Sequence, residues 1–140
     1  LLDGELIRSG VDAYLQAADK RLYLSNVLER TFPRGFDFEI FSRELLAEAM
    51  QRATLASDLE HVTPYIHQNR SGHVHFQHVT RQPDRSGYRL TVDTPEDFEL
   101  IKTLIEQHRA DQLPAEQIIA LLDAHPELVA VNAHIEQKKI

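Results

Sequence analysis

Asp93 is the residue with the clearest potential for chemistry, because it stands between an expected strand and an expected helix. Residues 88–92 alternate between polar and apolar side chains and predict a strand. Thr94 suits the N-cap and Pro95 the first position of a helix that we expect to run to about His108. In open α/β sheets ligands bind at the carboxyl ends of strands, where a fixed carboxylate could hold a hard cation that carries phosphates. The alternative is that Asp93 only caps the helix or fills a turn.

Two further carboxylates, Asp37 and Glu39, lie two residues apart on an expected strand over residues 36–41. Side chains at this spacing point to the same side of a strand. The pair follows a turn that contains Gly35, and it could bind sugar hydroxyls or a cation. The alternative is the solvent-facing side of an edge strand, where charge opposes aggregation.

His61 lies in an expected helix and follows Glu60, with Thr63 and Tyr65 close by in the sequence. Its imidazole could donate a hydrogen bond to an oxygen atom of a ligand. It could equally pack against the sheet.

The composition describes an ordinary globular chain and argues against some partners. The 140 residues carry 15 Lys and Arg against 22 Asp and Glu, which gives a net charge of −7 and disfavours a nucleic-acid surface. No apolar run approaches the length of a membrane span, so no membrane partner is expected. The absence of cysteine excludes disulfides and suits a cytoplasmic protein. Because the first residue is Leu rather than Met, we expect part of a longer protein.

The hydrophobic periodicity alternates between helical and strand patterns and predicts one α/β domain over residues 1–140. We find no glycine-rich phosphate loop of the P-loop or dinucleotide-binding type. The expected helices cover residues 4–18, 43–50, 57–66, 95–108 and 114–124, and the expected strands cover residues 21–25, 36–41, 73–80 and 88–92.

Several short motifs occur together and in order. They are Ser25-Asn26, Phe32-Pro-Arg-Gly-Phe-Asp-Phe-Glu39, Glu60-His-Val-Thr-Pro-Tyr65, Thr91-Val-Asp-Thr-Pro-Glu-Asp97 and the tail from His125 to Lys138. Together they resemble the SpsF-type cytidylyltransferase family of spore coat polysaccharide biosynthesis, which is related to the sugar-acid cytidylyltransferases. The resemblance covers nearly the whole chain and matches the C-terminal half of the family's domain.

The resemblance implies a nucleotide-diphospho-sugar transferase-like fold, a doubly wound sheet whose N-terminal nucleotide-binding half is absent here. It implies a Mg²⁺-dependent enzyme that transfers CMP from CTP to a sugar for surface polysaccharide or glycan biosynthesis. Asp93 would be the catalytic, metal-binding carboxylate, and the sugar side would be formed by Asn26, Asp37, Glu39 and His61. A homodimer is also implied, and the 140 residues alone are expected to be inactive.

One residue departs from the family pattern, and one rival function stays open. Leu59 stands where the family leads us to expect an arginine before Glu-His, which weakens any anion contact at that point. The rival is a non-catalytic dimerisation or interaction domain, with the apolar faces around Phe36 and the C-terminal helices as its surface.

Overall fold

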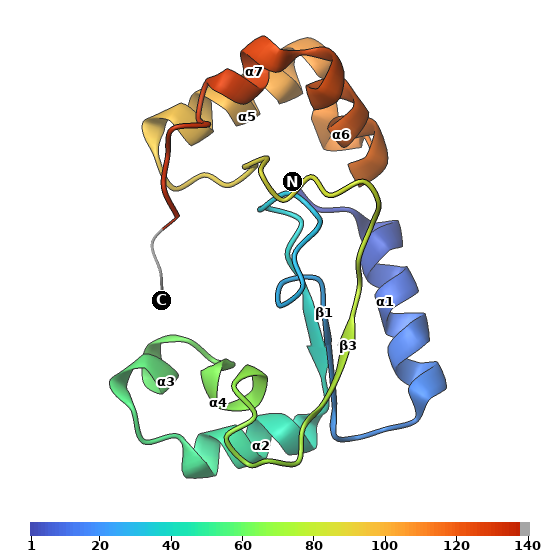
Figure 1. The fold of residues 1–140 in the computed structure, drawn as a ribbon, viewed down its shortest axis with the longest axis vertical. Helices are drawn as coiled ribbons and strands as arrows, with labels where there is room; N and C mark the ends of the chain where they lie inside the picture. Colours follow the sequence, from blue (N-terminus) through green and yellow to red (C-terminus); the bar gives the residue numbers. More distant parts are fainter. Residues whose placement is uncertain (138–140) are drawn as a thin grey trace. The chain divides into compact units, whose positions relative to one another are not determined.

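The computed structural model describes residues 1–137 (Figure 1). The chain forms two compact units. Among the described residues, the strand unit consists of residues 7–29 and 38–79, and the helical unit consists of residues 1–6, 30–37 and 80–137. Helices and a small sheet both occur, so the predicted α/β class is confirmed.

A three-stranded sheet lies at the centre of the strand unit. The middle strand, β1 (Leu22–Ser25), is antiparallel to β2 (Glu39–Phe41) and parallel to β3 (His75–His78). All four residues of β1 are buried, as a central strand requires. The predictions for residues 36–41 and 73–80 hold only in part, because the four residues of β1 limit the length over which neighbouring strands can pair.

The helix α2 (Arg43–Arg52) covers part of this sheet. Ser42 is its N-cap, as predicted, and its hydroxyl accepts a hydrogen bond from the Leu45 N–H at 3.1 Å. The helix contributes two residues to the buried core of the strand unit, which consists of Tyr23, Leu45, Ala49, Tyr65, Ile66 and Val74. The preceding helix, α1 (Gly4–Ala17), agrees with the prediction for residues 4–18.

The single helix predicted over residues 57–66 is wrong. Two short helices replace it, α3 (Ala56–Glu60) and α4 (Pro64–His67). Pro64 has no N–H to donate to the Glu60 carbonyl, and its ring would clash with that carbonyl in a continuous helix. The chain therefore leaves the helical path at His61 and resumes it at Pro64.

The helical unit contains α5 (Pro95–His108), the short 3₁₀ turn η1 (Ala110–Gln112), α6 (Ala115–Ala124) and α7 (Pro126–Ala130). Figure 1 shows α5, α6 and α7 gathered together. The predicted bounds of α5 are confirmed at both ends, and those of α6 to within one residue. The core of this unit consists of Phe36, Leu90, Leu100, Ile101, Leu104, Ala110, Ala115, Ile118 and Leu122.

Residues 88–92 form no strand, which corrects the prediction. Arg34 and Arg89 make one isolated parallel bridge, in which the Leu90 N–H donates to the Arg34 carbonyl at 2.7 Å. Gly35 then turns the chain with a φ of +113°, and a Cβ atom at this position would lie 2.3 Å from the Leu90 carbonyl oxygen. The left-handed backbone and the close approach both require glycine here, and they end the pairing after one bridge.

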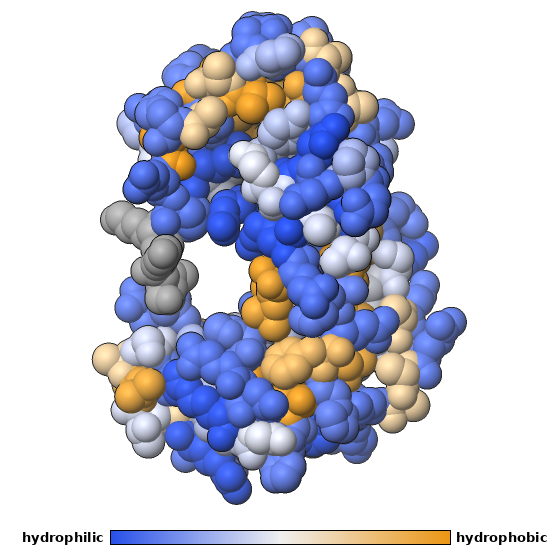
Figure 2. Space-filling model, viewed as in Figure 1, coloured by the Kyte–Doolittle hydropathy of each residue, from blue (hydrophilic) through white to orange (hydrophobic). Residues whose placement is uncertain are grey.

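Hydrophilic residues cover most of the face seen in Figure 2. No helix among the described residues is long and apolar enough to span a bilayer. Phe36 is only 3% exposed, so the predicted interaction surface around it is wrong, since it packs into the core of the helical unit. The large apolar side chains that are most exposed are Leu59 on α3, at 84%, and Met50 on α2, at 79%.

Candidate active site

Asp93 lies immediately before α5, at the entrance predicted from the sequence. The Thr94 hydroxyl accepts a hydrogen bond from the Asp97 N–H at 3.2 Å, and Pro95 begins the helix. The positive end of the helix dipole favours carboxylates at this position. The side chain of Asp93 is 62% exposed and therefore open to a ligand.

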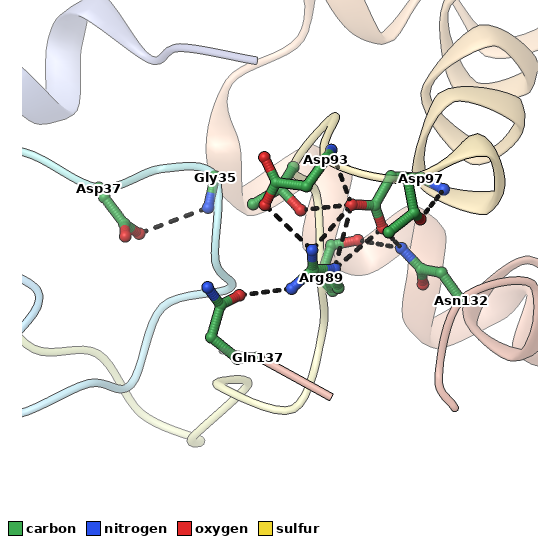
Figure 3. Close-up of polar contacts among 9 residues, drawn as sticks. Gly35, Asp37, Arg89, Asp93, Asp97, Asn132 and Gln137 are labelled. Carbon is green, nitrogen blue, oxygen red and sulfur yellow. Dashed lines mark hydrogen bonds and ion pairs between the residues drawn. The ribbon is translucent and has the colours of Figure 1, made fainter. Parts of the chain in front are cut away.

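Asp97 is the hub of the polar network around Asp93 and is fully buried (Figure 3). Its carboxylate accepts from Arg89 Nε at 2.9 Å, Thr91 Oγ1 at 2.7 Å, Asn132 Nδ2 at 2.8 Å and the Asp93 N–H at 3.1 Å. Burial alone would raise the pKa of Asp97, but these hydrogen bonds outweigh burial and hold the pKa far below its ordinary value. Asp97 is therefore a buried anion at neutral pH.

Arg89 connects the buried hub to the exposed carboxylate. Its guanidinium is 8% exposed, and Nη2 donates both to Asp97 Oδ2 at 3.0 Å and to Asp93 Oδ2 at 3.1 Å. Nη1 donates to the side-chain oxygen of Gln137 (Figure 3). The hydrogen bond to Asp97 raises the pKa of Arg89. A guanidinium held by three acceptors fixes one oxygen of Asp93 and leaves the direction of the carboxylate well defined.

Asp93 suits the role of a single carboxylate ligand to a hard cation. Its Oδ1 atom has no hydrogen bond within residues 1–137, whereas Oδ2 is held by Arg89. Mg²⁺ is usually held by one or two carboxylates together with substrate phosphates and water. Asp97 does not fit such a role, because both of its oxygens already accept hydrogen bonds. The described residues contain no cluster of three or more side chains that could bind a metal by itself.

Asp37 also belongs to the helical unit, but it lies outside β2. The prediction that Asp37 and Glu39 share one strand face is therefore wrong. Arg30 donates to the Asp37 carboxylate from Nη1 at 2.6 Å and from Nη2 at 2.8 Å. The Gly35 N–H approaches the same carboxylate at 3.4 Å (Figure 3). Its charge is balanced by an arginine in this structure.

Asn26, Glu39 and His61 lie in the strand unit. Asn26 is fully buried at the carboxyl end of β1, where its side-chain oxygen accepts from the Phe38 N–H at 3.0 Å. Glu39 is exposed and accepts from the Thr63 hydroxyl at 3.2 Å. His61 is partly buried and directly follows α3, where its N–H donates to the Ser57 carbonyl. The side chains of Asn26 and Glu39 both accept hydrogen bonds, whereas the contact of His61 uses its backbone N–H. The imidazole of His61 is therefore the least engaged of the three side chains.

Sequence reasoning did not assign roles to Arg89, Asp97, Asn132 or Gln137, which form the network. One local signal was present. Thr94 and Asp97 are three residues apart at a helix start, the spacing at which an acidic side chain turns back toward the preceding backbone. Nothing in the sequence alone indicates that Asn132 reaches the same carboxylate from 35 residues away.

Comparisons with known proteins place the fold and the network in context. No protein-family model matches the chain. A solved cytidylyltransferase from Leptospira borgpetersenii is 29% identical and superposes with a TM-score of 0.83, over 99% of this chain and 56% of its own length. The chain therefore has a nucleotidyltransferase-like α/β fold.

Two curated proteins are also similar in sequence. The spore coat polysaccharide biosynthesis protein SpsF of Bacillus subtilis is 30% identical over 90% of this chain and 52% of its own length. An uncharacterised protein of Methanocaldococcus jannaschii is 33% identical over 74% of this chain and 43% of its own length. The predicted resemblance is confirmed: the chain is related to the SpsF-type cytidylyltransferase family, and it spans about half the length of the curated relatives that it matches.

Proposed function

We propose that the protein transfers a cytidylyl group from CTP to a sugar, for surface polysaccharide or glycan biosynthesis. The relationship to SpsF and to the Leptospira cytidylyltransferase supports a CMP-transferring nucleotidyltransferase. The observation that carries the proposal is the exposed carboxylate of Asp93, which the buried Arg89–Asp97 pair holds at the start of α5. This arrangement presents one oriented negative charge to a ligand.

The reaction forms a bond between a sugar hydroxyl oxygen and the α-phosphorus of CTP. It breaks the bond between that phosphorus and the oxygen that bridges the α- and β-phosphates. Pyrophosphate leaves, and the hydroxyl proton passes to a base or to solvent. A bound Mg²⁺ would supply charge stabilisation at the phosphate oxygens. Asp93 would hold that ion through Oδ1, while Arg89 keeps Oδ2 in place. Orientation of the two reactants and preorganised charge then account for the catalysis.

The sugar would contact Asn26, Asp37, Glu39 and His61. Exposed carboxylates such as Asp37 and Glu39 accept hydrogen bonds from hydroxyl groups, and an imidazole can donate to a sugar oxygen. Sugar binding at Asp37 would have to share the carboxylate with Arg30. Of these residues, His61 is expected to affect sugar use most strongly, since its ring is the least committed to other contacts.

Replacement of Asp93 by Asn tests the proposal. In the full-length protein, the D93N variant keeps the shape of the side chain and removes its charge, so turnover of CTP and sugar to pyrophosphate should fall by about two orders of magnitude. Thermal unfolding should stay close to that of the parent protein, because the side chain is exposed. Stabilisation of the protein by Mg²⁺ and CTP together should be lost as well, which gives a readout independent of turnover.

The matched control is D111N, which removes another exposed aspartate, from η1. It should change neither turnover nor the Mg²⁺ response. Near-normal turnover of D93N with an unchanged dependence on Mg²⁺ would reject the role of Asp93.

A second candidate function, an interface between copies of the chain, is favoured by one apolar hollow. It has a volume of about 370 Å³ and is lined by Leu46, Ala49, Met50, Ala53, Asp58, Leu59 and Val62. Light scattering of the protein at micromolar concentration tests for a homodimer. If the hollow forms the interface, M50E combined with L59E should give a monomer, whereas the exposed replacement L15E on α1 should not.

A further inference from the structure

A separate polar hollow lies in the strand unit, at the amino-terminal ends of the parallel strands β1 and β3. It has a volume of about 470 Å³, within the range of small-molecule sites. Its lining consists of Arg21, Glu48, Arg52, Ser71, Gly72, His73 and His75. Asn26 follows the carboxyl end of β1, whereas the hollow lies at the amino-terminal end of that strand.

The lining is basic although the protein is acidic. Two arginines and two histidines line the hollow with a single carboxylate, in a chain whose net charge is −7. Glu48 is already engaged, because Arg21 donates to it at 2.6 Å and the Tyr65 hydroxyl at 3.2 Å. His75 is paired with Asp19, which lies outside the lining, at 2.6 Å. Two guanidinium groups and one carboxylate therefore line a common space, which leaves the lining with more fixed positive than negative charge.

Part of the lining is held rigidly before any ligand arrives. Arg21 Nε donates to the His73 carbonyl at 3.0 Å, and Nη2 donates to Ser71 Oγ at 3.3 Å. Ser71 Oγ also accepts from the His73 N–H at 3.1 Å, so its own O–H proton remains available to donate. Arg52 is exposed and has no hydrogen bond within residues 1–137. A fixed hydroxyl donor and a guanidinium that has no hydrogen bond among the described residues thus line the same hollow, although Arg52 also lies near enough to Glu48 to help lower the pKa of that carboxyl.

We propose that this hollow binds a phosphate-bearing small molecule. A planar guanidinium pairs with two phosphate oxygens at once, and Arg52 is free to do so. Ser71 would donate to a third oxygen, the guanidinium of Arg21 lies beside it, and the imidazole of His73 can donate a hydrogen bond. The site shares no residue with the network around Asp93, so it is independent of the proposed cytidylyl transfer.

Titration of the purified protein with inorganic phosphate, at ionic strength held constant with chloride, tests the proposal by nuclear magnetic resonance. The amide signals of Gly72 and His73 should shift and saturate. The R52Q variant should weaken phosphate binding by about tenfold or more, since it removes the bidentate partner. R52K retains the positive charge but not the two-nitrogen geometry of the guanidinium, so its affinity for phosphate should lie between those of the parent protein and R52Q. R43Q, which removes the same charge from an exposed position on the same helix, should bind phosphate normally.

Three outcomes would overturn the proposal. The first is a failure of the Gly72 and His73 signals to saturate with phosphate. The second is an equal loss of affinity in R43Q and R52Q, which would indicate attraction by overall charge. The third is equal binding of acetate and phosphate, which would show that the hollow does not select phosphate over a carboxylate. None of these results bears on the D93N experiment.

Discussion

Two arginines, one in each unit, form ion pairs in very different surroundings. Arg89 and Asp97 in the helical unit are 8% and 0% exposed, whereas Arg21 and Glu48 in the strand unit are 31% and 21% exposed. Every partner of the Arg89–Asp97 pair comes from the protein, so the pair serves to hold Asp93 and the start of α5. The Arg21–Glu48 pair borders an open hollow and leaves neighbouring donors for a ligand.

The physical difference lies in what remains when one partner is removed. Loss of one member of a buried pair leaves a charge without water or a counter-ion, which is strongly destabilising. Loss of one member of a partly exposed pair lets water solvate the other, and the net effect on stability is small. The comparison therefore predicts a large effect on folding in the helical unit and a small one in the strand unit.

The largest effect is expected for D97N. The substitution leaves the buried guanidinium of Arg89 without its main counter-ion, so the free energy of unfolding should fall by about 3–5 kcal/mol. Urea denaturation followed by circular dichroism measures this loss, with D111N as the exposed control. A loss below about 1 kcal/mol, the value typical of exposed pairs, would remove the distinction between the two arginines.

A smaller effect, with a definite pH range, should follow from the lowered pKa of Asp97. The unfolded carboxyl titrates near 3.8 and the folded one at lower pH, so its stabilising contribution is complete well above pH 3.8 and is lost as the pH falls through the folded pKa. The stability difference between the parent protein and D97N should be constant near neutral pH and shrink below pH 3.8. A difference that instead grows on acidification would show that the folded pKa is not lowered.

The smallest effect is expected for E48Q. Glu48 is held by Arg21 and by the Tyr65 hydroxyl, and the Arg21 hydrogen bond lowers the pKa of Glu48. Because the pair is partly exposed, the free energy of unfolding should fall by about 1 kcal/mol or less. The same urea experiment applies. A loss as large as that of D97N would mean that the strand unit depends on its ion pair as the helical unit does.

The elements that local chemistry determines were predictable from the sequence. The helix α5 has its predicted bounds, because Thr94 and Pro95 specify its start without help from distant residues. The expected strand over residues 88–92 was not found, because its pairing depends on Gly35, whose turn permits only one bridge. The helix expected over residues 57–66 is interrupted before Pro64, because proline lacks the N–H that a continuous helix requires, and this outweighs the hydrophobic pattern.

The candidate site divides in the same way. The position of Asp93 before a helix follows from local sequence and was predicted, although the strand expected before it did not form. The role of Asp97 was not, because it depends on donors from Arg89 and Asn132 that only the folded chain brings together. The same holds for Asp37, which accepts hydrogen bonds from Arg30, and for Glu39, which accepts one from Thr63. Residue type and spacing identified side chains that could bind a ligand. Only the structure shows which of these side chains already form hydrogen bonds or ion pairs within the protein.

The backbone of Asp93 has a consequence for hydrogen exchange. Its side chain is open to solvent, but its N–H donates to the buried carboxylate of Asp97. The amide hydrogen can exchange with solvent deuterium only when that bond opens, and local opening of a buried cluster is rare. The exchange rate of this one amide therefore reports how often the whole anchor of Asp93 comes apart, without any substrate present.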